Sequence, residues 1–263
     1  MRRYWLDPNE GDAVDHAEVG GTVRLAGDTL HHIRDVCRQG VGDRFEVLVD
    51  GRAYFVELQQ ETKRESVGRI LEIRDIEPLP FPRVRLALAI PRFPVFEAVL
   101  EKCVELGVEA IQPLFTEQSF IRTQSDTWSS KQPRFQKIIK GATQQCGRGE
   151  RMELLEPTKL APFLSDLTAD ANRGAQVGGL FAYEGSRDVP SRPIRESLEL
   201  VKAKEPRAVW VFVGGEGGFS RSEVQAFTAV GMEPTTLGQQ VLRVETACVA
   251  LVSILKYEWD LMR

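Results

Sequence analysis

The residues best suited to chemistry lie in a glycine-rich segment near the end of the chain, where four glycines surround one carboxylate. The apolar run Val209–Val213 indicates a buried strand, and Gly214–Gly218, which contains Glu216, follows it directly. Ser220 and Glu223 have the spacing of a capping box, which predicts that a helix begins here. A strand, a glycine loop and a helix in this order are typical of sites where backbone groups bind a small ligand.

A second loop of related design follows at Leu237–Arg243 and contains Gly238. Arg243 precedes an apolar helix, where its guanidinium group could hold a phosphate or a polarised carbonyl, or form a structural ion pair. Glu245 is more simply explained as a favourable charge at a helix N-terminus. The first loop alone is equally compatible with a tight turn, but two such loops close together predict a bound cofactor. Neither the Walker pattern nor the dinucleotide-binding pattern is present.

Composition restricts the class of protein. A chain of 263 residues favours two domains. Its four cysteines are scattered without metal-ligand spacing, which indicates reduced thiols in a cytoplasmic protein and no metal. We expect no signal peptide, and the uncharged run Thr246–Leu255 is too short to cross a membrane.

Residues 122–151 carry seven basic and two acidic side chains, although the whole chain has a net charge of −4. Arg134, Lys137 and Lys140 recur at intervals that place them on one side of a helix. A solvated helix face and a surface that contacts RNA phosphates explain this charge equally well. For His31 and His32 a structural role is favoured over catalysis, because adjacent side chains on a helix point to different sides.

Two kinds of secondary structure divide the chain. Residues 1–75 are predicted to be β-rich, with a helix over 28–37 capped by Asp28 and a hairpin turn at Asp50 and Gly51. A proline-rich connection follows at 77–82. Strands and helices then alternate, which predicts a parallel sheet with helices on both faces. The expected strands are 84–90, 110–114, 179–183 and 208–213, and the expected helices are 96–106, 133–146, 194–203 and 220–230.

Taken in order, these segments resemble the SPOUT superfamily of knotted methyltransferases, and most closely the bacterial 16S (small-subunit) ribosomal RNA uridine-N3 methyltransferases. The resemblance extends over almost the whole chain, and its order and spacing make it specific. Its strongest parts are Val213-Gly-Gly-Glu-Gly-Gly-Phe-Ser220 with Glu223, and Leu237-Gly238 with Leu242-Arg-Val-Glu-Thr-Ala247. Weaker parts include Met1-Arg-Arg-Tyr-Trp-Leu6, Leu30-His-His-Ile33, Glu101–Val108 and Arg134-Phe-Gln-Lys-Ile138.

The resemblance implies a PUA-like β-barrel RNA-binding domain over residues 1–76. It also implies an α/β methyltransferase domain over residues 77–263, whose last segments form a trefoil knot. S-adenosyl-L-methionine is the implied cofactor, and ribosomal RNA in the small ribosomal subunit is the implied substrate. The resemblance further implies a homodimer that acts in the cytoplasm, with no membrane and no metal. The apolar helix that follows Arg243 fits burial within one subunit or against a second subunit.

The resemblance also implies roles for individual residues. Arg243 would stabilise the anionic base or a phosphate, and Glu216 would orient the base or accept its proton. The implied cofactor-binding residues are Gly214, Gly215, Gly217, Leu237, Gly238 and Leu242. The implied RNA-binding residues are Arg2, Arg3, Arg134, Lys137 and Arg148.

Some positions differ from the pattern of the family. Gly215 replaces a usual proline, Gln118 a usual arginine and Gln144 a usual glutamate, and the segment Arg92–Val95 lacks the usual Lys-Gly-Asp-Arg. These differences leave room for two other functions, an RNA-binding assembly factor without turnover and a methyltransferase that acts on another RNA position. A small-molecule enzyme is disfavoured, because the N-terminal β unit and the basic helix would then have no evident role.

Overall fold

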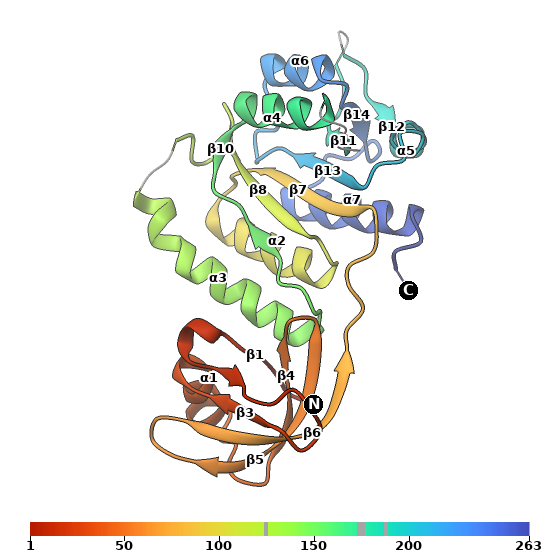
Figure 1. Ribbon diagram of the computed structural model, residues 1–263. Coiled ribbons are helices and arrows are strands. Elements are labelled where there is room, and N and C mark those ends of the chain that lie inside the picture. Colours follow the sequence, from red (N-terminus) through yellow and green to blue (C-terminus); the bar gives the residue numbers. More distant parts are fainter. Residues whose placement is uncertain (124–125, 173–176, 187–188, 263) are drawn as a thin grey trace. The chain divides into compact units, whose positions relative to one another are not determined.

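The computed structural model describes residues 1–123, 126–172, 177–186 and 189–262. These residues form two compact units (Figure 1). The first contains Met1–Pro78 and Lys140–Arg151, and the second contains Leu79–Ile139 and Met152–Arg263. The stretch 140–151 therefore belongs by its contacts to the first unit, which the sequence did not indicate. The assignment of separate functions to residues 1–76 and 77–263 stays a prediction.

The first unit is built on a six-stranded sheet with the order β1-β4-β5-β6-β3-β2. β1 and β4 run parallel, and the other neighbours are antiparallel. The sheet curls around a core that includes Tyr4, Phe45, Val56 and Ile70. Its elements are β1 (Arg3–Trp5), the 3-10 turn η1 (Pro8–Glu10), β2 (Ala13–Val14), β3 (Thr22–Leu25), α1 (Gly27–His31), the π-helical turn η2 (His32–Val36), β4 (Arg44–Val49), β5 (Arg52–Glu61) and β6 (Ser66–Asp75).

Two local predictions in this unit have different outcomes. Asp50 and Gly51 both have positive φ angles, 50° and 72°, which confirms the predicted hairpin turn. The predicted cap at Asp28 is wrong, because the helix begins at Gly27 after Ala26, which makes no side-chain cap bond. Buried Asp12 fixes this corner instead, since its carboxylate accepts hydrogen bonds from the Ala26 N–H at 2.8 Å and the Thr29 hydroxyl at 2.7 Å.

The second unit is built on a parallel sheet, as the alternation of strands and helices predicts. The order along its main path is β10-β8-β7-β13-β11-β14-β12, and β9 also pairs with β8. Its strands are β7 (Arg83–Ala89), β8 (Ala110–Phe115), β9 (Glu153–Leu154), β10 (Thr158–Lys159), β11 (Val177–Ala182), β12 (Arg192–Pro193), β13 (Ala208–Val213) and β14 (Glu233–Thr236). Each pairing among them is parallel.

Helices cover both faces of this sheet (Figure 1). α4 (Leu160–Asn172) and α6 (Arg221–Ala229) lie on one face, and their apolar side chains share a core with Phe181, Trp210 and Phe212. α2 (Phe93–Glu105) and α7 (Val244–Glu258) lie on the other face, and α5 (Ile194–Lys202) packs beside β14. This arrangement confirms the predicted layers. It places the loops that follow β11, β13 and β14 together at the carboxyl ends of their strands.

The prediction that the basic helix begins at Pro133 is wrong. The helix α3 runs from Asp126 to Cys146 and has Pro133 inside it. Trp128 and Phe135 lie on either side of the proline, and both rings are fully buried against Phe96. Burial of two large rings on one helix face outweighs the backbone hydrogen bond that a proline removes.

Candidate functional site

A cavity of about 770 Å³ lies at the carboxyl ends of β11, β13 and β14 in the second unit. Its size falls within the usual range for small-molecule sites. It brings together the two glycine-bearing loops that the sequence singled out. All eight residues predicted to bind cofactor or act in catalysis line it: Gly214, Gly215, Glu216, Gly217, Leu237, Gly238, Leu242 and Arg243.

The first loop is a tight turn that requires glycine at some of its positions. A Cβ atom at Gly214 would lie 2.7 Å from the Cα atom of Gly218, which is too close for any side chain. Gly218 has a φ angle of 70° and donates its N–H to the Gly215 carbonyl at 3.0 Å. Gly215 itself has more space, because a Cβ atom there would meet nothing nearer than the Gln118 carbonyl oxygen at 3.6 Å. The turn therefore exposes its backbone to the cavity.

The predicted capping box after this loop is confirmed. The Ser220 hydroxyl accepts the N–H of Glu223 at 3.3 Å, and the Glu223 carboxylate accepts the N–H of Ser220 at 2.8 Å. The same carboxylate accepts the N–H of Glu117 at 2.8 Å, although Glu117 lies 106 residues earlier in the chain. One buried side chain thus connects the start of α6 to the turn that follows β8.

Glu216 has a structural contact that the sequence did not reveal. Its Oε1 atom accepts a hydrogen bond at 3.1 Å from the backbone N–H of Arg92, the residue that precedes α2. Arg92 also lines the cavity, and its side chain is exposed. Glu216 therefore fixes the start of α2 against the glycine loop, and the residue itself lines the cavity.

Thr236, which precedes the second loop, fixes the backbone of Gly238. The Thr236 hydroxyl donates to the Gly238 carbonyl at 2.9 Å and accepts the Gly238 N–H at 3.2 Å. The φ angle of Gly238 is 126°, a conformation that favours glycine. The loop ends at Arg243, which precedes α7 and whose side chain is exposed. Within the described part of the chain no partner holds its guanidinium group, so it can receive an anionic group in the cavity.

A third segment completes the wall. Tyr183, Glu184 and Gly185 follow β11 and line the same cavity. The sequence predicts the strand, but no site residue was expected after it. Ligands bind at the carboxyl ends of parallel strands, and this rule applies to β11 as well as to β13. The rule could therefore have identified these residues from the sequence.

The RNA-binding residues predicted in the second unit are exposed on α3. Arg134 forms an ion pair with Glu97 of α2, with a distance of 2.5 Å between Nε and Oε1. This guanidinium group lowers the pKa of Glu97, and the carboxylate raises the pKa of Arg134. Lys137 is also exposed and has no such pair among the residues that the structure describes. Of the two, Lys137 is therefore the freer to contact a phosphate.

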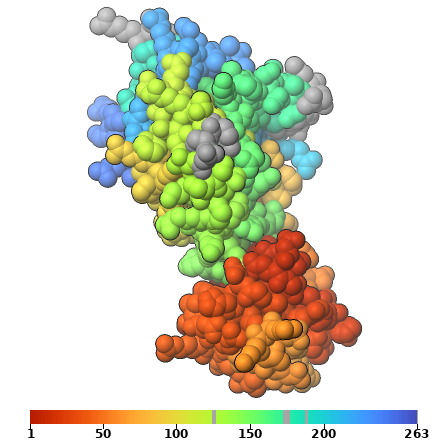
Figure 2. All heavy atoms as spheres, turned by 90° about the vertical axis from the view of Figure 1, so that its left-hand side faces the viewer, coloured from red at the N-terminus to blue at the C-terminus, as the bar shows by residue number. Residues whose placement is uncertain are grey.

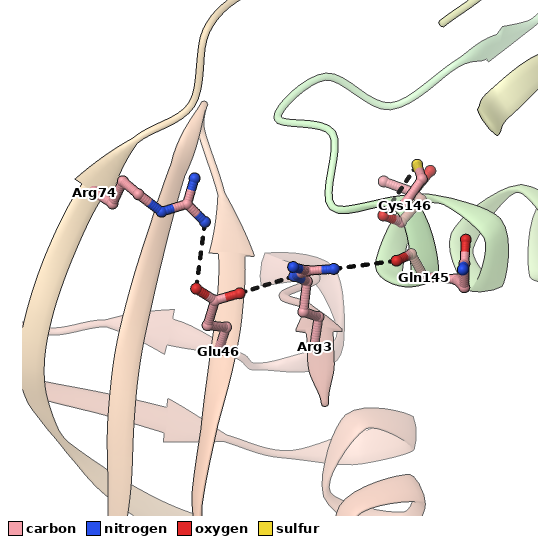
Figure 3. Close-up of polar contacts among 6 residues, drawn as sticks. Arg3, Glu46, Arg74, Gln145 and Cys146 are labelled. Carbon is pink, nitrogen blue, oxygen red and sulfur yellow. Dashed lines mark hydrogen bonds and ion pairs between the residues drawn. The ribbon is translucent and has the colours of Figure 1, made fainter. Parts of the chain in front are cut away.

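Arg3 in the first unit lies between an acidic side chain and a helix end (Figure 3). Its Nε atom donates to Glu46 at 2.8 Å, and Nη1 donates to the Gln145 carbonyl at 3.1 Å. Arg74 donates to the other oxygen of Glu46 at 3.3 Å. Burial raises the pKa of Glu46, but hydrogen bonds from the two arginines outweigh this effect and lower it overall. Arg3 is thus part of the packing of its unit.

The other predicted RNA-binding residues have mixed surroundings. Arg2 is exposed and donates to the Cys37 carbonyl at 2.9 Å. Arg148 is half-buried. The two histidines also have ordinary structural contacts, since His31 pairs with Asp35 at 2.7 Å and the His32 and Tyr4 rings meet edge to face. The hydrogen bonds from Arg34 and His31 lower the pKa of Asp35 to about 2.

Metal-binding clusters of three or more His, Cys, Asp or Glu residues do not occur among the described residues. Within the same residues, every helix is too short or too polar to span a bilayer. The fold and the cavity define an α/β protein with a small-molecule site at the carboxyl edge of a parallel sheet.

Comparison with known proteins gives the family. Residues 77–256 match the family described as the RNA methyltransferase domain, and residues 25–71 match the RNA methyltransferase PUA domain. The chain belongs to this family of RNA methyltransferases, which confirms the resemblance to the SPOUT superfamily.

Similar proteins carry a consistent name. A protein from Synechocystis is 30% identical over 90% of this chain and 73% of its own length. A protein from Bacillus subtilis is 26% identical over 100% of this chain and 99% of its own length. Both are named ribosomal RNA small subunit methyltransferase E. A solved methyltransferase structure from Legionella pneumophila, with bound S-adenosylmethionine, is 26% identical and covers 98% of each chain with a TM-score of 0.79.

Proposed function

We propose that this protein transfers a methyl group from S-adenosylmethionine to N3 of a uridine in 16S ribosomal RNA of the small ribosomal subunit. The family and the names of its relatives support an RNA substrate. The observation that carries the proposal is the single cavity in which the two glycine-bearing loops, Glu216 and Arg243 meet.

The residues around this cavity fit S-adenosylmethionine. The cavity of about 770 Å³ has room for a ligand of that size. Its apolar residues, among them Leu237 and Leu242, suit an adenine ring, and the carboxylates of Glu184 and Glu245 suit the positively charged groups of the cofactor. Gly214, Gly215 and Gly217 line the cavity without side chains, so their backbone groups can approach a ligand. A Cβ atom at Gly217 would lie 3.0 Å from the Gln118 side chain, so this position also favours glycine. Gly214, Gly215, Gly217, Leu237, Gly238 and Leu242 would hold the cofactor.

When bound, the cofactor supplies a methyl group that its sulfonium centre already activates. The protein must therefore provide position and assist the loss of the proton from uracil N3, which is a poor nucleophile while protonated. Arg243 would stabilise the anionic base or a neighbouring phosphate. Glu216 would orient the base or accept its proton through the carboxylate oxygen that does not hold the Arg92 N–H.

Recognition of the RNA would use both units. Residues 1–76 would act as the PUA-like RNA-binding domain, with Arg2 and Arg3 at the RNA. Arg148, which follows α3 and belongs by its contacts to the first unit, would also contact RNA, and Arg134 and Lys137 would contact phosphates from α3. The contacts of Arg3 with Glu46 and of Arg134 with Glu97 favour Arg2 and Lys137 as the stronger contributors. The protein would bind the small ribosomal subunit in the cytoplasm.

We also propose that residues 77–263 form a trefoil knot and that the protein is a homodimer. The sheet order supports the knot, because β14 lies between β11 and β12 although it follows both in the chain. Exposed Tyr257 on α7 supports a second subunit at that helix. Sedimentation should give twice the mass of the 29.5 kDa chain, and a monomer mass would contradict the dimer. An experimental structure without a threaded chain would contradict the knot.

The test is a choice of substrates. The purified protein is incubated with labelled S-adenosylmethionine and, separately, small ribosomal subunits that lack the modification, large subunits and transfer RNA. We expect the label in the RNA of small subunits. Label in another RNA would replace the proposed substrate, and cofactor binding without transfer to any RNA would contradict the proposed activity. Absence of both would favour the assembly-factor function.

A further inference from the structure

An exposed phenylalanine lies on a firmly held turn in the second unit. The Phe120 side chain is 56% exposed. Its backbone N–H donates to the Ile90 carbonyl at 2.8 Å. The buried Ser119 hydroxyl accepts the Thr116 N–H at 2.9 Å and lies 3.1 Å from the Leu114 carbonyl oxygen, to which it donates. The ring is therefore presented to solvent from a fixed backbone and would lose little conformational freedom on binding.

Other aromatic rings support Phe120 from behind. The Phe93 ring meets it edge to face, with centroids 6.2 Å apart and an interplanar angle of 79°. Phe93 in turn lies against Phe135, which packs on Phe96 and Trp128. The last three rings are fully buried. Phe120 is thus the exposed outer member of a rigid aromatic cluster.

The segments that hold this aromatic pair also contact the glycine loop. Arg92 precedes Phe93, lines the cavity and donates its backbone N–H to Glu216. Gln118 lies two residues before Phe120, and its side chain packs against Gly217. Phe93 and Phe120 therefore stand close to the cavity in which methyl transfer is proposed.

The charges around the pair are suited to a nucleic acid. The Lys131 Nζ atom lies 5.8 Å from the centroid of the Phe93 ring. Arg92 and Arg122 are exposed. The negative charge of Glu97 is matched by its ion pair with Arg134. The first turns of α3 lie on the face shown in Figure 2. Exposed rings among cations are the usual means of binding unpaired bases and their phosphates.

We infer that Phe120, supported by Phe93, stacks on an unpaired base next to the methylated nucleotide, with Arg92 and Lys131 at the flanking phosphates. This inference rests on the proposed function. A base that enters an enzyme cavity leaves the RNA stack, and its neighbour then loses a stacking partner. The Phe120 ring replaces that partner at the rim of the cavity, so it acts as a positioning residue for the RNA.

The first test compares three variants in methyl transfer to small ribosomal subunits. Phe120→Ala should raise KM for the RNA about fivefold or more, which corresponds to the loss of one stacked base. Its affinity for S-adenosylmethionine should stay unchanged, because the ring does not line the cavity. Phe120→Trp should retain the KM of the natural protein. Phe81→Ala is the matched control, since Phe81 is 55% exposed elsewhere on the same unit, and it should have no effect.

The second test detects stacking directly. RNA with 5-iodouridine beside the methylated position is irradiated with the protein, and the cross-linked peptide is identified by mass spectrometry. We expect the peptide that contains Phe120, and its loss in Phe120→Ala. Normal transfer with an unchanged KM and no such cross-link would overturn the inference and leave the proposed function intact. Absence of transfer by the natural protein would contradict both.

Discussion

Two arginines, Arg92 and Arg243, line the cavity. Of these, Arg243 belongs to the second glycine-bearing loop. Replacing Arg243 by glutamine should lower kcat about 100-fold, because the proposed mechanism uses its positive charge to stabilise a developing anion. Cofactor affinity, measured by calorimetry, should change little. Arg243→Lys serves as the control, and it should recover only part of the rate because it lacks the planar fork of the guanidinium group. Equal rates for the natural protein and Arg243→Gln would contradict this role.

Gly214 and Gly215 form a matched pair for testing the glycine loop. Gly214→Ala places a Cβ atom 2.7 Å from the Gly218 Cα atom, whereas Gly215→Ala meets nothing nearer than 3.6 Å. We expect Gly214→Ala to destabilise the protein by about 1–3 kcal/mol and to weaken cofactor binding. Gly215→Ala should retain both properties. Thermal unfolding with and without S-adenosylmethionine measures each effect, and similar behaviour of the two variants would contradict the proposed steric origin.

Single residues also show where sequence interpretation has limits. The glycines and Arg243 could be identified because their types and spacing are local features of the chain. The ion pairs of Arg3 with Glu46 and of Arg134 with Glu97 could not, since their members lie 43 and 37 residues apart. The same holds for the hydrogen bond from Arg92 to Glu216, which spans 124 residues. Such partners become visible only when the chain is folded.

At the start of α6, two substitutions are expected to destabilise the protein to different extents. Ser220→Ala removes the cap hydroxyl and should destabilise the protein by about 1 kcal/mol. Glu223→Ala should cost more, because the buried carboxylate accepts both the Ser220 N–H and the Glu117 N–H at 2.8 Å. Hydrogen exchange should show faster exchange at Glu117 only in Glu223→Ala. Equal exchange in both variants would contradict the link between α6 and the turn after β8.

Two helices differ from the prediction, and a proline lies in each of them. Pro133 resembles a helix start by its type, but burial of Trp128 and Phe135 extends α3 to Asp126. α4 was not predicted, although Leu160, Phe163, Leu164 and Leu167 follow helical spacing and all face the core. Proline at position 162 suggests a break, yet it lies in the first turn, where it is tolerated. Tertiary packing thus extended α3 against a local signal, whereas the local apolar spacing of α4 agrees with the helix that forms.

At the scale of the whole molecule, the first unit should lose stability in acid through Glu46. The pKa of Glu46 in the folded protein lies below its ordinary value of 4.5, so the ion pairs stabilise fully above that value. This stability is lost as pH falls through the lower folded-state pKa. Glu46→Gln should reduce stability at neutral pH by about 1.5–3 kcal/mol, because two arginines lose a charged partner. Its stability should then depend less steeply on pH.

Hydrogen exchange of β4 amides over a range of acid pH measures this effect within one unit. Glu72→Gln is the control, since Glu72 is an exposed carboxylate on the same sheet. It should follow the natural protein. An equally steep loss of protection in Glu46→Gln would contradict the role of the ion pairs.

The sequence predicts that the second unit has a parallel sheet covered by helices, but it does not predict the order of the strands. Alternating strands and helices predicted the parallel sheet, because apolar runs such as Val209–Val213 need cover on both faces. The order of strands, with β13 between β7 and β11, was not readable, since it depends on pairing between distant segments. The grouping of Lys140–Arg151 with the first unit was missed for the same reason.

We propose above that the protein methylates N3 of a uridine in the RNA of the small ribosomal subunit. Its most direct test is nucleoside mass spectrometry of that RNA after reaction with the purified protein and S-adenosylmethionine. We expect new 3-methyluridine, and we expect Arg243→Gln to produce it much more slowly. Methylation of another base atom or of ribose, with no 3-methyluridine, would contradict it.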